Sequence, residues 1–425
     1  MGQVGFGSYR ISIRSAPHRE ALTLALKLGC PLIDTSANYT SGESEELIGA
    51  VLAEHPESRP KIVTKAGYIQ GPNIKMLEEL NSKSQALDDL VDLGEDLKHS
   101  IHPDFLRNQI DHSLKRLKCS SVDTFLLHNP EYYFKTEGAN QEEYYRRIKK
   151  AFEYLEEEVQ KGRIKQYGIS SNHFILPINH PEVTDLNRVL EISQSIASKN
   201  SFGAIQFPLN LIEIGALEKH GDYGEQSLLE LAQFNGLMTM SNRPLNAFVN
   251  NQLVRLATYE FLTNGHDEEK AQRQFEKCMS LIEVKWNQAL QDDQLVDRED
   301  FGELVLIKQF VELWRTLPTI DAVEQVYFGH LFPFIARIWG GNGLSAKEAA
   351  PFYELLEHSY LFARKNMTNK ALHFKSQAQG VGIIPAHSTQ ALSVEVIETY
   401  LNYGIDFVLL GMKNVDYVNQ VKHLF

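Results

Sequence analysis

Residues 32–49 read LIDTSANYTSGESEELIG. The segment begins with the end of a short apolar run, residues 31–34, which is typical of a buried parallel strand. Polar residues follow, and from residue 44 onward the apolar positions recur with the spacing of an amphipathic helix. A strand, a polar connection and a helix in this order predict one βα unit of a parallel sheet.

The same pattern recurs along most of the chain. Short apolar runs alternate with longer amphipathic stretches up to about residue 244, and one further strand, residues 406–410, lies between two helical stretches near the end. The other predicted strands are residues 4–9, 31–34, 61–65, 122–128, 166–171, 204–207 and 237–242. Eight strands that alternate with eight helices indicate a TIM (β/α)8 barrel.

A long segment interrupts this alternation. Residues 247–376 are rich in helix formers, with candidate helices at 267–290, 301–316, 320–339 and 347–365. We interpret them as a helical insertion between strand 7 and helix 7, so that the barrel comprises residues 1–246 and 377–425. A smaller extension, residues 67–100, follows strand 3. Both segments leave from the carboxyl ends of strands, where barrel enzymes carry their active sites.

The composition narrows the class of protein. The 425 residues are 43% hydrophobic with a net charge of -13, which favours a soluble globular protein and argues against a nucleic-acid or anionic membrane partner. The three cysteines are widely spaced and form no metal-binding pattern, which fits a reducing compartment. We find neither a signal peptide nor an apolar run long enough to cross a membrane, and we expect a cytoplasmic protein.

Four polar residues stand at the ends of predicted strands: Asp34, Tyr39, Lys65 and His128. Hydride delivery to a carbonyl group leaves an alkoxide, so such a site needs a proton donor, and a phenol serves if its pKa is lowered. We expect Lys65 to lower the pKa of Tyr39, Asp34 to hold Lys65, and His128 to donate a hydrogen bond that orients the carbonyl group. Taken singly, each residue also suits an ordinary structural role, such as a cap, rim packing or a buried counter-ion.

Together the four residues resemble the catalytic tetrad of the aldo-keto reductase family. The family's pattern after strand 2 is matched by Asp34 and Tyr39 followed by the Gly42-Glu43-Ser44-Glu45 segment, and the resemblance covers the barrel on both sides of the insertion. It implies a NAD(P)(H)-dependent oxidoreductase that acts on an aldehyde, a ketone or a sugar, with Tyr39 as the proton donor. The nearby aromatic residues Tyr68, Tyr132 and Tyr133 are candidates for substrate contacts.

The resemblance also implies a set of cofactor contacts. Ser171, Asn172 and Gln206 correspond to residues that bind the nicotinamide carboxamide, and Lys413 stands where relatives often carry an arginine for the 2'-phosphate, which favours NADP(H) over NAD(H). The alternatives are an ordinary turn at 171–172 and a solvated lysine. The family's aromatic residue after strand 7 is absent here. The remaining predicted cofactor contacts are Asn242, Arg243, Pro244, Leu245, Gly411 and Asn414.

Two other classes of function stay open at this point. One is a catalytically weak regulatory or interaction module that keeps the barrel and binds the cofactor. The insertion would then be a partner surface, although it also suits a lid over the active site or an oligomer interface. The other is hydrolysis on a TIM barrel, which lacks support because neither a metal-ligand cluster nor a paired-carboxylate motif is present in the sequence.

Overall fold

The computed structural model describes residues 2–75, 77, 87–219, 226–249, 252–257, 267–291, 309–310, 312–340 and 344–425. The chain divides into two compact units. One comprises Met1–Val254 together with Val394–Phe425, and the other comprises Arg255–Ser393. The candidate helix at 301–316 lies largely outside the described residues.

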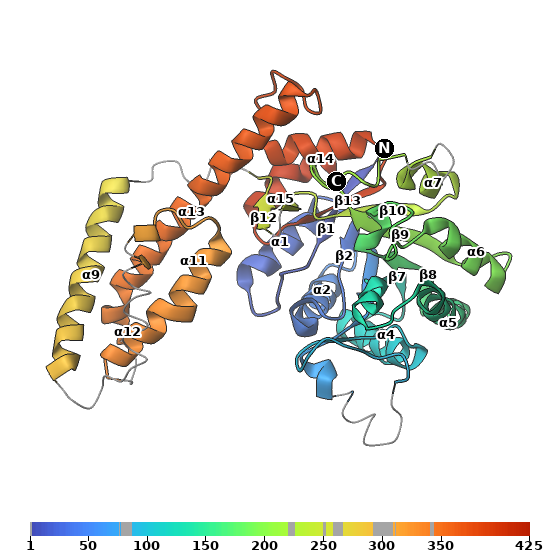
Figure 1. Cartoon of the computed structure of the whole chain (residues 1–425), viewed down its shortest axis with the longest axis horizontal. Coiled ribbons are helices and arrows are strands. Elements are labelled where there is room, and N and C mark those ends of the chain that lie inside the picture. Colours follow the sequence, from blue (N-terminus) through green and yellow to red (C-terminus); the bar gives the residue numbers. More distant parts are fainter. Residues whose placement is uncertain are drawn as a thin grey trace. The chain divides into compact units, whose positions relative to one another are not determined.

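The first unit is a closed barrel of parallel strands, with helices around it (Figure 1). Around the barrel the strands follow the order β1-β13-β10-β9-β8-β7-β3-β2. Their bounds are β1 Gln3–Gly7, β2 Leu32–Asp34, β3 Lys61–Ala66, β7 Val122–His128, β8 Ile164–Ser170, β9 Phe202–Pro208, β10 Met238–Asn242 and β13 Phe407–Gly411. The predicted TIM (β/α)8 fold is therefore confirmed.

The helices between the strands begin where the sequence provides caps. Ser15 accepts a hydrogen bond from the amide of His18 at the start of the first helix, and Ser227 forms a capping box with Glu230. The helices of the barrel are α1 Ala16–Lys27, α2 Glu43–Glu54, α4 Pro103–Leu117, α5 Gln141–Gln160, α6 Leu186–Ile196, α7 Leu228–Phe234, α14 Leu392–Asn402 and α15 Val415–Val421.

Short elements decorate the connections between strands and helices. The extension after β3 forms a three-stranded antiparallel sheet, and two strands follow β10. The turns of helix after β2, β7 and β8 place polar residues at the strand ends. The bounds are β4 Tyr68–Ile69, β5 Val91–Asp92, β6 Lys98–His99, β11 Asn246–Val249, β12 Gln252–Arg255, η1 Tyr39–Gly42, η2 Pro130–Lys135, η3 Asn172–Ile175 and η6 Lys422–Leu424.

The barrel interior is filled by side chains from several strands. Leu32, Val63, Leu126, Ala204 and Met240 are fully buried there and pack together with residues of β13. Burial of such side chains stabilises the fold by about 1.5–3 kcal/mol each for the larger ones. Because this apolar layer ends before the carboxyl ends of the strands, the side chains at that end can be polar.

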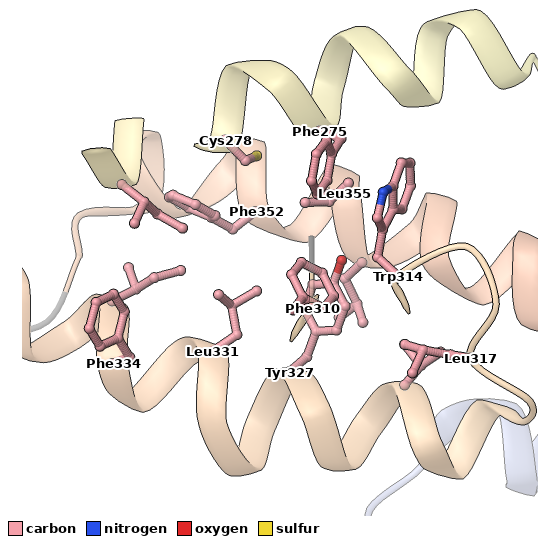
Figure 2. Packing of buried hydrophobic residues seen from close by; sticks show 14 of the residues in the cluster. Phe275, Cys278, Phe310, Trp314, Leu317, Tyr327, Leu331, Phe334, Phe352 and Leu355 are labelled. Carbon is pink, nitrogen blue, oxygen red and sulfur yellow. The ribbon is translucent and has the colours of Figure 1, made fainter. Parts of the chain in front are cut away.

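The second unit is helical and has a hydrophobic core of its own. Its helices are α9 Glu268–Gln291, α11 Ile320–Val326, the π-helical turn η5 Tyr327–Leu331, α12 Phe332–Ile338 and α13 Ala346–Gly380. Figure 2 shows Phe275 and Cys278 of α9 facing residues of α13, and Phe275 stacks on Trp314 with ring centroids 4.7 Å apart. Tyr327 shares a buried 2.7 Å hydrogen bond with Ser359. This packing agrees with a folded helical insertion.

Candidate active site

The parallel arrangement brings the four predicted catalytic residues to one end of the barrel. Asp34 ends β2, Lys65 lies near the end of β3 and His128 ends β7. Tyr39 begins η1, which follows β2 after the connecting residues 35–38. In a TIM barrel the carboxyl ends of all strands meet at one rim, so strands distant in sequence contribute neighbouring side chains. The sequence therefore places these residues correctly at strand ends.

Lys65 and Asp34 form a buried ion pair. The Nζ of Lys65 lies 2.6 Å from Asp34 Oδ1 and 2.8 Å from the carbonyl oxygen of Thr35, and the lysine side chain is fully buried. Burial lowers the pKa of Lys65, and the adjacent Asp34 carboxylate opposes that shift. The predicted role of Asp34 as the partner of Lys65 agrees with this contact.

Gln206 is a second partner of Asp34. Its Nε2 donates to Asp34 Oδ1 across 2.8 Å, and its Oε1 accepts from the hydroxyl of Ser170 at 2.8 Å. The sequence predicts Gln206 as a contact of the nicotinamide carboxamide, and that role stays a prediction. Nothing in the local sequence of β9 indicates the contact with Asp34.

Tyr39 lies between the ion pair and the other aromatic rings. The Nζ of Lys65 is 5.1 Å from the centroid of the Tyr39 ring, and the ring of His128 meets it edge-on at 5.9 Å. Burial raises the pKa of Tyr39 well above 10, and the charge of Asp34 adds to that shift. The pKa of Tyr39 is therefore raised and not lowered as expected, because burial dominates and the Asp34 carboxylate lies beside the Lys65 ammonium.

The backbone after Tyr39 is held in an unusual conformation. Thr40 and Ser41 both have positive φ angles, 49° and 57°, which are uncommon for residues other than glycine. The hydroxyl of Thr40 donates to the carbonyl oxygen of Ile11 across 2.8 Å. Two such residues in succession cost about 1–3 kcal/mol each and are found where the surrounding structure enforces them. The turn fixes the start of η1, where Tyr39 lies.

His128 is buried beside Tyr39. Burial lowers the pKa of its imidazole well below 6.5, and the charges of Lys65 and His99 lower it further. The ring is therefore neutral at physiological pH. Its Nδ1 lies 3.0 Å from the hydroxyl oxygen of Ser36.

An aromatic cluster lies against the ring of His128. The ring of Tyr68 meets His128 edge-on at 4.8 Å and contacts His99 and Tyr132 at 5.6 and 5.0 Å. The Nε2 of His99 donates to the carbonyl oxygen of His128 across 2.8 Å, and burial lowers the pKa of His99 to about 4. Tyr68 and Tyr132 thus lie near the tetrad as predicted.

Two observations on this cluster differ from the sequence reasoning. Tyr133 packs against Phe134 and Tyr144, with ring centroids 5.7 and 6.5 Å away. The sequence reasoning missed His99, which lies in the two-residue strand β6. A strand that short has no periodicity, so only the proximity of the extension to β3 could have drawn attention to it.

The predicted nicotinamide contacts after β8 form a local turn. The hydroxyl of Ser171 accepts from the amide of His173 at 3.0 Å and shares a hydrogen bond with Thr184. The backbone amide of Asn172 donates to Glu131 Oε1 across 2.9 Å, and burial raises the pKa of Glu131. These contacts hold the segment at the carboxyl end of the barrel, beside Ser170.

The end of β10 and the turn that follows it contain the next predicted cofactor contacts and two buried polar atoms. Ser241 Oγ and Asn242 Oδ1 are buried without a hydrogen-bond partner among the residues that the structure describes. Arg243 has a φ of 54° and pairs with Glu213 at 2.6 Å. Pro244 and Leu245 form the turn between β10 and β11. Buried polar atoms without partners favour a ligand at this segment.

The last predicted contacts lie between β13 and α15. Gly411 ends β13, and Asn414 caps α15 by accepting from the amide of Tyr417 across 3.0 Å. The pKa of His18 in α1 is lowered by burial and then by the charge of Lys413, so these two side chains lie close together. The segment is thus adjacent to the start of α1.

Among the residues that the structure describes, no group of three or more His, Cys, Asp or Glu side chains could hold a metal ion. No helix in the same ranges has both the length and the apolar character needed to cross a membrane.

Known proteins share parts of this sequence. Human aflatoxin B1 aldehyde reductase member 4 is 33% identical over 120 residues, which cover 28% of this chain and 28% of the relative. An NADP(+) aldo-keto reductase of Schizosaccharomyces pombe is 27% identical over 173 residues, covering 39% of this chain and 42% of the relative. The matched stretches thus span less than half of these relatives.

Solved structures and a family model add to the comparison. The glycerol dehydrogenase of Gluconobacter oxydans is 17% identical, with a TM-score of 0.48 over 99% of this chain and 86% of that one. The model of the aldo/keto reductase family matches residues 1–220, more than half of the 425 residues. The chain belongs to the aldo/keto reductase family.

Proposed function

We propose that the protein is an NADP(H)-dependent oxidoreductase that interconverts a carbonyl group and an alcohol on a small molecule. The observation that carries this proposal is the buried Lys65–Asp34 ion pair, whose Nζ lies 5.1 Å from the ring centroid of Tyr39. Family membership supports the same reaction class.

Each residue of the site has a part in this reaction. The cofactor, when bound, supplies or accepts the hydride. Tyr39 is a neutral phenol because burial raises its pKa, so its O–H can donate to the substrate oxygen. Lys65 stabilises negative charge that develops on that phenol during proton transfer, and Asp34 holds Lys65 in place. The proton and the hydride thus reach the two ends of one carbonyl bond.

The cofactor is proposed to lie along the carboxyl ends of β8, β9, β10 and β13. Ser241 Oγ and Asn242 Oδ1, which are buried without partners among the described residues, fit a polar ligand there. Lys413 supports NADP(H) over NAD(H), since an ammonium suits a 2'-phosphate. The relative from Schizosaccharomyces pombe is named for NADP(+).

The substrate is proposed to be an aldehyde, a ketone or a sugar. Tyr9 and Tyr68 supply aromatic surface near Tyr39 and His128, and the ring of Tyr9 meets Tyr39 edge-on at 5.1 Å. The helical insertion is proposed as an oligomer or partner surface. A cytoplasmic location is proposed because the three cysteines are free thiols.

The test combines cofactor titration with turnover. Calorimetric titration should give tighter binding of NADPH than of NADH, and Lys413→Ala should reduce that difference about tenfold. A panel of aldehydes, ketones and sugars should then show turnover that Tyr39→Phe abolishes while cofactor affinity stays unchanged. The matched control is Tyr9→Phe, because Tyr9 contacts the same ring and is 61% exposed.

Three results would count against this proposal. Normal turnover in Tyr39→Phe would remove Tyr39 from the role of proton donor. Tight cofactor binding without turnover on any carbonyl would favour the regulatory module instead. Failure to bind either cofactor would leave the barrel without an oxidoreductase function.

A further inference from the structure

Glu131 links the end of β7 to the segment that is predicted to bind nicotinamide. It lies in η2, shortly after His128, and its Oε1 accepts a hydrogen bond from the backbone amide of Asn172 across 2.9 Å. The residue is buried, with 4% of its surface exposed. Hydrogen bonds from a backbone amide to a carboxylate are among the stronger ones in proteins, so this contact fixes the two segments against each other.

Asn172 lies just beyond the region in which strand pairing fixes the backbone. The amide of Ser171 still donates to the carbonyl oxygen of Gln206 in β9 across 3.0 Å. The amide of Asn172 has no strand partner among the described residues, and the carboxyl group of Glu131 takes that place. The position of Asn172 therefore depends on a side chain and not on the barrel alone.

The side chains of the two neighbouring residues differ in their contacts. The hydroxyl of Ser171 accepts from the amide of His173 at 3.0 Å and shares a 2.9 Å hydrogen bond with Thr184, which shares one of 2.8 Å with Tyr144. The side chain of Asn172 is partly exposed and makes no hydrogen bond within the part of the chain that the structure describes. Its amide offers a donor and an acceptor, which together complement a primary carboxamide.

Stability alone does not account for a carboxyl group at this position. Glu131 Oε2 is buried without a hydrogen-bond partner among the residues that the structure describes, and burial raises the pKa of Glu131. A buried carboxyl oxygen that loses its hydration without gaining a partner costs free energy. An apolar side chain would avoid that cost, but it could not accept a hydrogen bond from Asn172.

We propose that Glu131 is a positioning residue that holds the backbone of Asn172, so that the asparagine side chain binds the carboxamide of the nicotinamide beside the catalytic residues. This inference deepens the proposed function and rests on it for the identity of the cofactor. Glu131 acts through its acceptor oxygen on Asn172 and does not itself touch the cofactor or the substrate.

The consequence is an effect on one end of the cofactor. Residues 171–172 are the predicted contacts of the nicotinamide, whereas Gly411, Lys413 and Asn414 are predicted to contact the adenosine phosphates. Loss of the hydrogen bond to Glu131 should therefore weaken the binding of whole NADPH and spare an analogue that lacks the nicotinamide. General damage to the barrel would weaken the binding of both.

The deciding experiment is calorimetric titration of the full chain with NADPH and with 2'-phospho-ADP-ribose, the same nucleotide without nicotinamide. Glu131→Leu removes the acceptor and should weaken NADPH binding about tenfold, the equivalent of one hydrogen bond to a charged group, with unchanged affinity for the analogue. Glu131→Gln keeps an acceptor oxygen and should retain the affinity for NADPH. Glu131→Asp keeps the charge but is one methylene shorter, so it should behave like Glu131→Leu, and it provides the same comparison if the leucine variant does not fold.

The matched control is Glu156→Leu. Glu156 is also a buried carboxyl group, and it accepts from the backbone amide of Ser201 and, at 2.9 Å, from the hydroxyl of Tyr167. Ser201 directly precedes β9, so this contact lies at the opposite end of the strands from Asn172. Urea unfolding measures the loss of stability in both leucine variants, and only Glu131→Leu should also lose affinity for NADPH.

Hydrogen exchange of the Asn172 amide tests the contact itself without any ligand. We expect protection in the unmodified protein and in Glu131→Gln, and faster exchange in Glu131→Leu and Glu131→Asp. The proposal would be overturned by unchanged NADPH affinity in Glu131→Leu, by equal weakening of NADPH and the analogue, or by an affinity that follows the charge instead of the acceptor. Failure of the unmodified protein to bind NADPH would refute the proposed function and this role with it, whereas the other three results arise only in variants of a protein that binds the cofactor.

Discussion

The side-chain amide of Gln206 donates to Asp34 Oδ1 across 2.8 Å, although 172 residues separate them in the chain. Lys65 donates to the same oxygen from 2.6 Å. Asp34 Oδ1 thus accepts from one charged donor and one neutral donor, which fixes the orientation of the carboxylate. The ion pair is therefore supported by β9, which lies opposite β2 in the order of strands around the barrel.

Gln206→Leu removes both side-chain hydrogen bonds of Gln206 with little change in volume. We expect the free energy of unfolding to fall by about 1–3 kcal/mol, because Ser170 and Asp34 each lose a buried partner. Turnover should fall as well, since Lys65 and Asp34 are held less firmly. Urea unfolding and steady-state kinetics measure the two effects.

The matched control is Gln166→Leu in β8. It removes the 3.0 Å hydrogen bond that Gln166 donates to the hydroxyl of Thr124 in β7. That variant should lose stability without losing activity. Equal loss of turnover in both variants would mean that Gln206 acts only on general stability.

Lys65→Met leaves the Asp34 carboxylate buried without its cation. Removing one partner of a buried ion pair typically costs about 3–5 kcal/mol, because the remaining charge is uncompensated. We expect a loss of that order in urea unfolding, together with complete loss of turnover. Adding Asp34→Asn to Lys65→Met should recover part of the stability but none of the activity. If the double variant is less stable than Lys65→Met, the unpaired carboxylate is not the cause.

The sequence predicts the barrel because each strand and helix is indicated by a pattern within a short stretch of residues. The predicted strand at residues 122–128 has the same bounds as β7 in the structure. Asp34 and His128 lie at the ends of parallel strands, and the topology of the barrel brings those ends together. The contact of Gln206 with Asp34 joins residues 172 positions apart, and the contact of Ser36 with His128 joins residues 92 positions apart. The local hydrophobic pattern of the sequence does not predict such contacts. The direction of the Tyr39 pKa shift depends on burial, which requires the folded structure.

His99 makes stability depend on pH. Its pKa is about 4 in the folded protein against 6.5 in the unfolded chain, so between these values the unfolded chain binds a proton that the folded protein does not. Stability should therefore fall as the pH decreases from about 6.5 to about 4, by up to about 3 kcal/mol from this residue.

His99→Gln keeps a donor for the carbonyl oxygen of His128 and cannot titrate. The variant should show a shallower dependence of the unfolding free energy on pH across that window. The difference between the two proteins isolates His99 from other histidines, His128 included. Parallel curves for the two proteins would contradict the assigned pKa of His99.

Gly67 lies where a side chain would collide with the catalytic region. A β-carbon there would come within 2.2 Å of the His128 carbonyl oxygen and 2.6 Å of His99 Nε2. Gly67→Ala should therefore displace the bond between these histidines, lower stability by about 1–3 kcal/mol and reduce turnover. Thermal unfolding and kinetics test this. Gly329→Ala, where a β-carbon meets nothing within 4 Å, should cost no stability and no activity.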